Sequence, residues 1–204
     1  MGDLFYSIDK SLFYFCNQTL ANPVFDVTMP LLTDWNKTWW GLTIFGLAWL
    51  ALIVKGGKKG RMIGLLLIPL IFLTDQVNST VIKKIVARPR PCHEINGIPV
   101  LEHIRLLVPC GAGYSFPSSH AANSFGVATL LAFYYRRWSW AFFLFASVMA
   151  FSRVSVGVHY PSDVLAGGIV GGALAVGVIT IYEAIGKKMT WLSVRDSPTD
   201  ELKV

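Results

Sequence analysis

Five long runs of apolar residues divide this chain of 204 residues, at 39–54, 62–85, 118–135, 139–158 and 164–185. A helix rises about 1.5 Å per residue, so it crosses the roughly 30 Å hydrocarbon core of a bilayer with about 17 to 25 apolar residues. The runs approach or reach this length, and the chain is 53% hydrophobic but only 15% charged, which excludes an ordinary soluble domain. We therefore predict an all-α, polytopic membrane helix bundle with about five transmembrane helices.

The segment before the first run, residues 1–38, differs from the rest of the chain. Its apolar residues recur at helical spacing, at Leu4, Phe5, Ile8, Leu12 and Phe15. Charged residues such as Asp9 interrupt any spanning run, so we expect an amphipathic helix that lies in the membrane interface. Packing of this helix on the bundle without lipid contact is an equal alternative. Since no soluble domain is left over, residues 1–204 are expected to form one membrane-embedded domain.

The basic residues indicate how the bundle is oriented. Ten of the eighteen lie between the first and second runs, between the third and fourth, or after the fifth. Basic loops stay preferentially in the cytoplasm, so residues 187–204 are expected to form a cytoplasmic tail and residues 86–117 an extracytoplasmic loop. The other eight basic residues lie on or near the opposite side. The predicted orientation therefore holds only if these eight basic residues have a function that explains their place on the outer side.

Three clusters of polar residues lie at the outer ends of the runs. They are Lys83 with Arg90, then Ser118, Ser119 and His120, and finally Arg153, His159 and Asp163. Cations near lipid are costly and usually serve an ion, a substrate or a partner charge. Guanidinium groups donate paired hydrogen bonds to phosphate, and the N–H groups at a helix N-terminus bind anions. The clusters therefore predict a phosphate-binding pocket at the outer face.

His159 and His120 are expected to have different roles in phosphoryl transfer. A neutral imidazole attacks phosphorus when its other nitrogen is held, and Asp163 follows His159 by one helical turn. We therefore expect His159 to be the nucleophile and Asp163 to orient it. His120 remains as the acid that protonates the leaving oxygen and later activates water. The expected phosphate-binding groups are Lys83, Arg90, Ser118, Ser119 and Arg153. This scheme requires neither a metal nor a cofactor.

The spacing of these residues resembles a known signature. Lys83-x6-Arg90-Pro91, Pro117-Ser118-Ser119-His120 and Ser152-Arg153-x5-His159-x3-Asp163 are similar to the three motifs of the type 2 phosphatidic acid phosphatase family, which includes the vanadium haloperoxidases and glucose-6-phosphatase. The resemblance implies a lipid phosphatase in which these residues take the family's site roles. Ser119 stands where the family usually has glycine. Because a backbone N–H is thought to act there, a small serine should be tolerated.

The resemblance also limits the substrate and the location. A pocket at the headgroup layer favours a lipid phosphate whose tails stay in the bilayer, and among bacterial members the choices are undecaprenyl diphosphate, phosphatidylglycerophosphate, phosphatidic acid and lipid A. We expect the bacterial cytoplasmic (inner) membrane, with the active site facing the periplasm or exterior, and no nucleic-acid partner. The sequence leaves the oligomeric state open. Alternatives are a lipid phosphotransferase, a non-catalytic anion-binding membrane protein and a vanadate-dependent haloperoxidase.

Several polar residues outside the motifs have two interpretations. Asp75 shares a helix face with Lys83 and either supports the basic cluster or makes a structural hydrogen bond elsewhere. Cys92 and Cys110 bracket the long loop, where a disulfide is possible outside the cytoplasm. Among the remaining basic residues, Arg88 is the best candidate to contact substrate. Nearby histidines and glutamates lack the spacing of metal ligands, so we expect no metal site.

Overall fold

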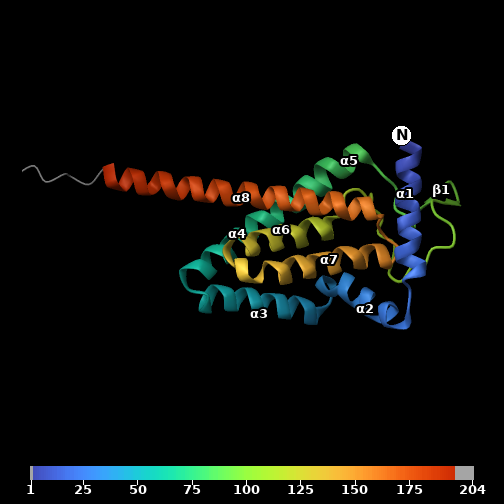
Figure 1. The fold of residues 1–204 in the computed structure, drawn as a ribbon, viewed down its shortest axis with the longest axis horizontal. Coiled ribbons are helices and arrows are strands. Elements are labelled where there is room, and N and C mark those ends of the chain that lie inside the picture. The colour runs from blue at the N-terminus through green and yellow to red at the C-terminus, as the bar shows by residue number, and fades with distance from the viewer. Residues whose placement is uncertain (1, 196–204) are drawn as a thin grey trace, which may run out of the picture.

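The computed structural model describes residues 2–195 and confirms the predicted all-α bundle (Figure 1). The helices are α1 (Gly2–Tyr14), α2 (Pro23–Thr33), α3 (Trp39–Lys55), α4 (Gly57–Gln76), α5 (Lys83–Val86), α6 (Ser119–Tyr134), α7 (Ser139–Ser155) and α8 (Pro161–Arg195). Short π-helical segments, η1 (Phe15–Thr19) and η3 (Val77–Ile82), and 3-10 turns, η2 (Trp35–Lys37) and η4 (Arg136–Trp138), lie between them. Helices therefore occupy all five predicted spans.

Two helices are long and apolar enough to cross a bilayer by length and composition alone. One is Gly57–Val86, 30 residues that join α4, η3 and α5, and the other is Pro161–Gly186 within α8. α3 is apolar but shorter, at 17 residues. Large apolar side chains point outward from these helices, with Leu47 61% and Ile169 73% exposed. A soluble protein would not leave such surfaces in water, so this is a membrane protein.

α6 lies at the centre of the bundle and packs against α4, α7 and α8. Its contact with α8 depends on glycine. A Cβ on Gly171 would lie 1.9 Å from the carbonyl oxygen of Ala122, and one on Gly167 would lie 2.4 Å from that of Ser118. The two backbones approach this closely only because α8 has no side chains there. The approach brings the start of α6 beside the start of α8.

The N-terminal segment contains more structure than one interfacial helix. α1 lies crosswise over one end of the bundle (Figure 1), and its expected apolar stripe, from Leu4 to Phe15, is exposed. Phe13 and Asp9 face the protein instead, 0% and 4% exposed. α2 was not anticipated, although Asn22 caps its first turn by accepting the N–H of Phe25 and a proline follows at position 23. α2 packs on α7, so residues 1–38 both face outward and join the bundle.

The loop between α5 and α6 covers the same end of the bundle as α1. It contains a two-stranded hairpin, β1 (Glu94–Ile95) and β2 (Ile98–Pro99), whose turn is formed by Asn96 and Gly97 at positive φ. Cys92 and Cys110 are joined by a disulfide with 6.0 Å between their Cα atoms. The loop is therefore anchored at both ends before it reaches α6.

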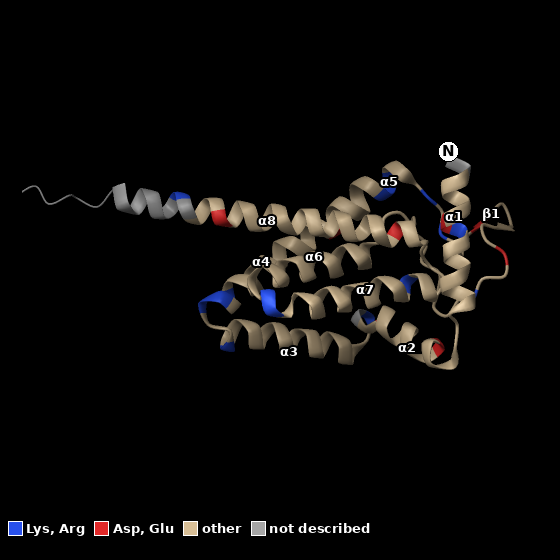
Figure 2. Cartoon of the chain, viewed as in Figure 1, with Lys and Arg blue, Asp and Glu red and all other residues tan. Residues whose placement is uncertain are grey.

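Lys and Arg gather at both ends of the bundle (Figure 2). One group lies at the turn between α3 and α4 and at the turn between α6 and α7, and the other lies around α5, α1 and the end of α7. α8 stays helical to Arg195, so residues 187–195 of the expected cytoplasmic tail continue this helix. Residues 196–204 of that predicted tail lie outside the described residues.

Candidate active site

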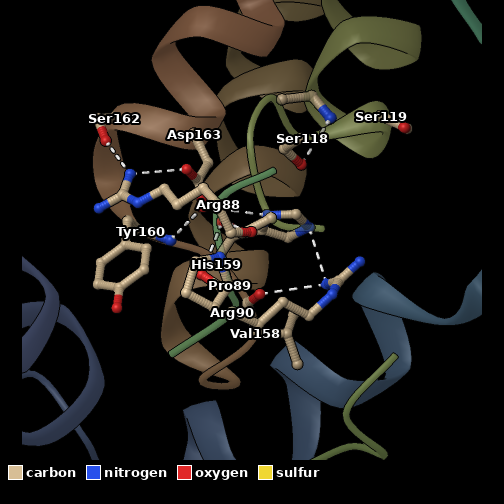
Figure 3. A network of polar contacts seen from close by, with 12 residues as sticks. Arg88, Pro89, Arg90, Ser118, Ser119, Val158, His159, Tyr160, Ser162 and Asp163 are labelled. Atoms are coloured by element: carbon tan, nitrogen blue, oxygen red, sulfur yellow. Dashed lines mark hydrogen bonds and ion pairs between the residues drawn. The ribbon is translucent and has the colours of Figure 1, made fainter. Parts of the chain in front are cut away.

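Residues from all three polar clusters lie close together, among them Arg90, Ser118, His159 and Asp163 (Figure 3). Two backbone hydrogen bonds join them. The N–H of Ser118 donates to the carbonyl oxygen of Asp163 at 2.9 Å, which links the second cluster to the third. The N–H of Ser115 donates to the carbonyl oxygen of Arg88 at 2.8 Å, which links the loop before α6 to the segment that carries Arg90. Residues far apart in the sequence thus form one site.

His159 lies in the turn between α7 and α8 and is 1% exposed. The turn requires Gly157, whose φ is +90° and where a Cβ would lie 2.6 Å from the carbonyl oxygen of Arg105. α8 begins two residues after the histidine, at Pro161, which suits the first turn of a helix. The chain therefore reverses sharply and holds the imidazole against the ends of both helices.

The contacts of His159 define its tautomer. Nη1 of Arg90 lies 3.2 Å from Nε2 of the imidazole, and Nδ1 lies 3.4 Å from Oδ2 of Asp163. A guanidinium only donates, so Nε2 must be the acceptor and Nδ1 carries the hydrogen that points to the carboxylate. The lone pair on Nε2 therefore faces the cationic side of the site.

Burial is the largest factor that lowers the pKa of His159 well below its ordinary value of 6.5, and the positive charges of Arg90, Arg153 and Lys83 lower it further. Such an imidazole is neutral at physiological pH. Arg90 is held in place by two carbonyl oxygens, that of Gly113 at 2.7 Å from Nε and that of Val158 at 3.2 Å from Nη1. The site thus combines a neutral imidazole with fixed positive charge.

Arg153 extends the cationic side toward α2. Its Nη1 donates to the hydroxyl of Thr33 at 2.9 Å and lies 3.8 Å from Oδ1 of Asp34. The buried Nε of Arg153 has no hydrogen-bond partner within the described residues. Sequence reasoning did not connect Thr33 or Asp34 with the site, because they lie about 120 residues before the arginine. Arg153 therefore keeps a donor for an anion.

The start of α6 carries the two serines of the expected phosphate cradle. Ser118 is fully buried, and its hydroxyl caps the helix by accepting the N–H of Ala121 at 3.5 Å. Because this contact uses only a lone pair, the O–H of Ser118 is still a donor, and its role as a phosphate ligand stays a prediction. Ser119 is half-buried, and its hydroxyl lies 3.4 Å from Nδ2 of Asn78. The N–H groups of the first helical turn have no intrahelical acceptor and remain suited to an anion.

His120 faces a cavity of about 590 Å³ between α3, α4, α6 and α7. Its Nε2 is buried and has no hydrogen-bond partner in the part of the chain described. Ser119 and Asp75 share the cavity wall, whereas the deeper wall is apolar and includes Leu42 and Phe45. The π-helical segment η3 separates Asp75 from Lys83, so the regular helical spacing that suggested their pairing is interrupted. Asp75 remains a candidate support for the basic cluster.

Arg88 was the remaining basic residue expected to contact substrate, and in the structure its charged contacts are with two carboxylates. Its Nη1 lies 2.8 Å from Oδ1 of Asp163, and its Nη2 lies 2.7 Å from Oδ2 of Asp9. Its guanidinium stacks on the ring of Tyr160, with Cζ 3.7 Å from the ring centroid. These contacts favour a supporting role over the expected contact with substrate. Arg88 therefore belongs to the support of the site.

His93 lies in the loop between α5 and α6 and makes two contacts within it. Nε2 of His93 lies 2.8 Å from the carbonyl oxygen of Gly111, and its Nδ1 accepts the N–H of Arg90 at 3.3 Å. His93 thus ties the loop together. Among residues 2–195 no three His, Cys, Asp or Glu side chains are grouped as metal ligands. The absence of a metal requirement stays a prediction.

Comparison with known proteins places these motifs in context. A profile of the PAP2 superfamily matches residues 63–187, more than half of the chain. Lipid A 4'-phosphatase of Bacteroides thetaiotaomicron is 39% identical over 104 residues, which are 50% of this chain and 46% of that protein. Undecaprenyl-diphosphatase BcrC of Bacillus subtilis is 28% identical over 88% of this chain and 91% of its own.

A solved structure agrees in fold. The crystal structure of LpxE from Aquifex aeolicus superposes with a TM-score of 0.69 and 25% identity, over 85% of this chain and 95% of that one. The transmembrane PAP2 type phosphatidylglycerolphosphate phosphatase from Bacillus subtilis superposes with a TM-score of 0.66 at 22% identity, which supports the fold alone. The matched profile includes every residue of the three clusters.

Proposed function

Because the chain belongs to the PAP2 superfamily, we propose that it hydrolyses phosphate from a membrane lipid phosphate or diphosphate through a phosphohistidine on His159. One observation carries the proposal. A buried imidazole, that of His159, lies between Nη1 of Arg90 at 3.2 Å and Oδ2 of Asp163 at 3.4 Å, and the charges of Arg153 and Lys83 also lower its pKa. An anion site alone has no need of a nucleophile oriented by a carboxylate, so this arrangement favours phosphoryl transfer over simple anion binding.

The proposed reaction follows from the orientation of the imidazole. The lone pair of Nε2 of His159 attacks phosphorus while the bond from phosphorus to the leaving oxygen breaks, and His120 supplies the proton to that oxygen. The cations neutralise the charge on the equatorial phosphoryl oxygens. The oxygen of a water molecule then attacks phosphorus while the bond from phosphorus to Nε2 breaks, His120 takes the proton of the water, and orthophosphate leaves. Asp163 holds the Nδ1 hydrogen throughout.

The cavity supports a lipid substrate. It extends from the polar end at Ser119 and His120 to an apolar wall, and about 590 Å³ lies within the usual range for ligand pockets. An apolar chain would fill the deeper part while its phosphate reaches the cations. Two relatives are named for undecaprenyl diphosphate and lipid A, and we propose these, phosphatidylglycerophosphate and phosphatidic acid as the substrates to test.

We place the enzyme in the bacterial cytoplasmic membrane with the site at its outer face. The basic turns between α3 and α4 and between α6 and α7 lie at the opposite end of the bundle from the site, as expected for a cytoplasmic surface (Figure 2). The disulfide between Cys92 and Cys110 lies in the loop that leads to the site, and disulfides persist outside the cytoplasm. Both observations support the same orientation.

Phosphate release from a panel of purified lipid phosphates tests the proposal. The wild-type chain should release orthophosphate from at least one of them, and His159→Ala should release none while unfolding at an unchanged temperature in detergent. His103→Asn is the matched control, because His103 is exposed at positive φ, which asparagine tolerates. Near-normal turnover by His159→Ala would exclude the nucleophile. Transfer of label to an added acceptor lipid, without orthophosphate, would identify a phosphotransferase instead.

A further inference from the structure

α1 places a buried carboxylate at the edge of the active site. Asp9 is 4% exposed although the apolar side chains of its helix point outward. Its Oδ1 accepts the backbone N–H of Ser162 at 2.9 Å, and its Oδ2 accepts the hydroxyl of Ser162 at 2.5 Å. Oδ2 also lies 2.7 Å from Nη2 of Arg88. A buried carboxylate is costly unless it is fully paired, and Asp9 is paired on both oxygens.

Arg88 connects this carboxylate to a second one. Its planar guanidinium binds Asp9 through Nη2 and Oδ1 of Asp163 through Nη1, at 2.7 and 2.8 Å. Nη1 also donates to the hydroxyl of Ser162 at 2.7 Å, and the ring of Tyr160 lies under the guanidinium. A rigid fork held at this many points has little freedom to rotate. The position of Arg88 is therefore determined in part by Asp9.

Asp163 carries the connection to the nucleophile with its other oxygen. Oδ2 accepts the N–H of Tyr160 at 2.8 Å and faces Nδ1 of His159 at 3.4 Å. Because Oδ1 is held by Arg88, the carboxylate cannot rotate without losing a charged contact. Figure 3 shows Arg88, Asp163 and His159 side by side in this order. A continuous chain of contacts thus runs from the N-terminal helix to the imidazole.

We propose that Asp9 is a positioning residue for phosphate hydrolysis: through Arg88 it holds the Asp163 carboxylate that orients His159. This inference rests on the proposed function. When Asp9 loses its charge, Nη2 of Arg88 loses its carboxylate partner, and the guanidinium is free to shift together with Oδ1 of Asp163. A misplacement of about 1 Å at a reacting group lowers turnover by up to about a hundredfold. Substrate binding is unaffected, because Asp9 does not line the cavity.

α1 has other anchors that keep it in place when Asp9 is replaced. Phe13 is 0% exposed, and its ring lies 5.8 Å from that of Tyr160. The hydroxyl of Tyr14 donates to the carbonyl oxygen of Glu102 at 2.8 Å. Asp9→Asn therefore removes the charge without removing the helix from the bundle. The effect on turnover can then be separated from an effect on folding.

The experiment compares Asp9→Asn and Asp9→Glu with Asp26→Asn in the full-length protein in detergent. Asp26 on α2 also pairs with an arginine, Arg105 at 2.6 Å, but at a 38% exposed position without contact to His159. For the lipid phosphate that the wild type hydrolyses fastest, Asp9→Asn should lower kcat about tenfold to a hundredfold with KM within about twofold. Asp9→Glu keeps the charge and should retain more activity. Asp26→Asn should keep the wild-type kcat.

A second measurement applies if Asp9→Asn folds poorly. Since Asp9 acts through Arg88, Arg88→Lys should lower kcat at least as much, and Asp9→Asn added to Arg88→Lys should lower it no further. Independent, multiplicative losses would overturn the inference. So would a kcat of Asp9→Asn within about twofold of wild type, a change confined to KM, or no rescue by Asp9→Glu. If the wild type releases no phosphate, the proposed function fails and the inference fails with it. If the wild type is active and the Asp9 variants keep the same kcat as Asp26→Asn, the inference alone fails.

Discussion

Arg90 offers the sharpest test of the catalytic geometry, because a conservative replacement keeps its charge and removes its shape. Its guanidinium contacts the carbonyl oxygens of Gly113 and Val158 and Nε2 of His159, at 2.7, 3.2 and 3.2 Å. These contacts come from two different nitrogens, Nε and Nη1. Lysine has a single ammonium, which occupies one position and cannot hold both carbonyls and the imidazole. Arg90→Lys should therefore lose two of the three contacts.

The size of the loss follows from those contacts. The two carbonyl contacts fix the position of the charge, whereas the contact with Nε2 must open when that lone pair attacks phosphorus, so the loss is one of positioning. A misplacement of about 1 Å at a reacting group lowers the rate by up to about a hundredfold, which is roughly 3 kcal/mol at about 1.36 kcal/mol per tenfold. The kcat/KM of Arg90→Lys should then fall on the order of a hundredfold. A fall in kcat as well is expected, because the charge on the phosphoryl oxygens is greatest in the transition state.

The assay is colorimetric phosphate release by purified protein in detergent micelles, with the unfolding temperature measured alongside. Arg105→Lys is the matched control. Arg105 binds Asp26 and the carbonyl oxygen of Asn17 but has no contact with the imidazole. A kcat/KM of Arg90→Lys within about threefold of wild type, or an equal loss in Arg105→Lys, would show that the guanidinium fork is not what the site requires.

Three further predictions concern packing, pH and metals. Gly171→Ala should lower the free energy of unfolding by about 1 to 3 kcal/mol, because the added Cβ would meet the carbonyl oxygen of Ala122. Gly177→Ala is the control, because a Cβ there has nothing within 4 Å and should leave the free energy of unfolding unchanged. Thermal unfolding in detergent compares the two variants. Since burial and nearby cations lower the pKa of His159, the acid limb of the pH profile of kcat/KM should lie below pH 6.5. Below pH 6.5 the imidazole of His159 binds a proton in the unfolded chain but not in the folded state, so the unfolding temperature should also fall as the pH falls. An acid limb of kcat/KM above pH 6.5 would contradict the assignment. Activity should survive EDTA, because the described residues group no three metal-ligating side chains; loss restored by magnesium would contradict this.

The class of fold and the motifs of the candidate site could be predicted from the sequence alone. Bilayer thickness imposes a length on each span, so apolar runs reveal helices without knowledge of their partners. His159 and Asp163 are four residues apart, and the short segment from His159 in the turn to Asp163 in the first turn of α8 keeps their side chains 3.4 Å apart. Each of the cations Lys83, Arg90 and Arg153 likewise lies within a short motif. These features depend on short stretches of chain and therefore appear in the sequence.

Other features depended on contacts between distant segments, which leave no periodic trace. Asp9 and Arg88 are 79 residues apart, and Thr33 and Arg153 are 120 apart, so neither pair could be recognised before the helices were packed. The charge of Asp9 was expected in the membrane interface and is buried instead, because it forms an ion pair with the guanidinium of Arg88. The sequence by itself thus determined the five spanning segments and the three motifs, because each depends on residues close together in the chain. Only the tertiary structure decided which carboxylates hold the cations, because ion pairs form by proximity in space and not by position in the chain.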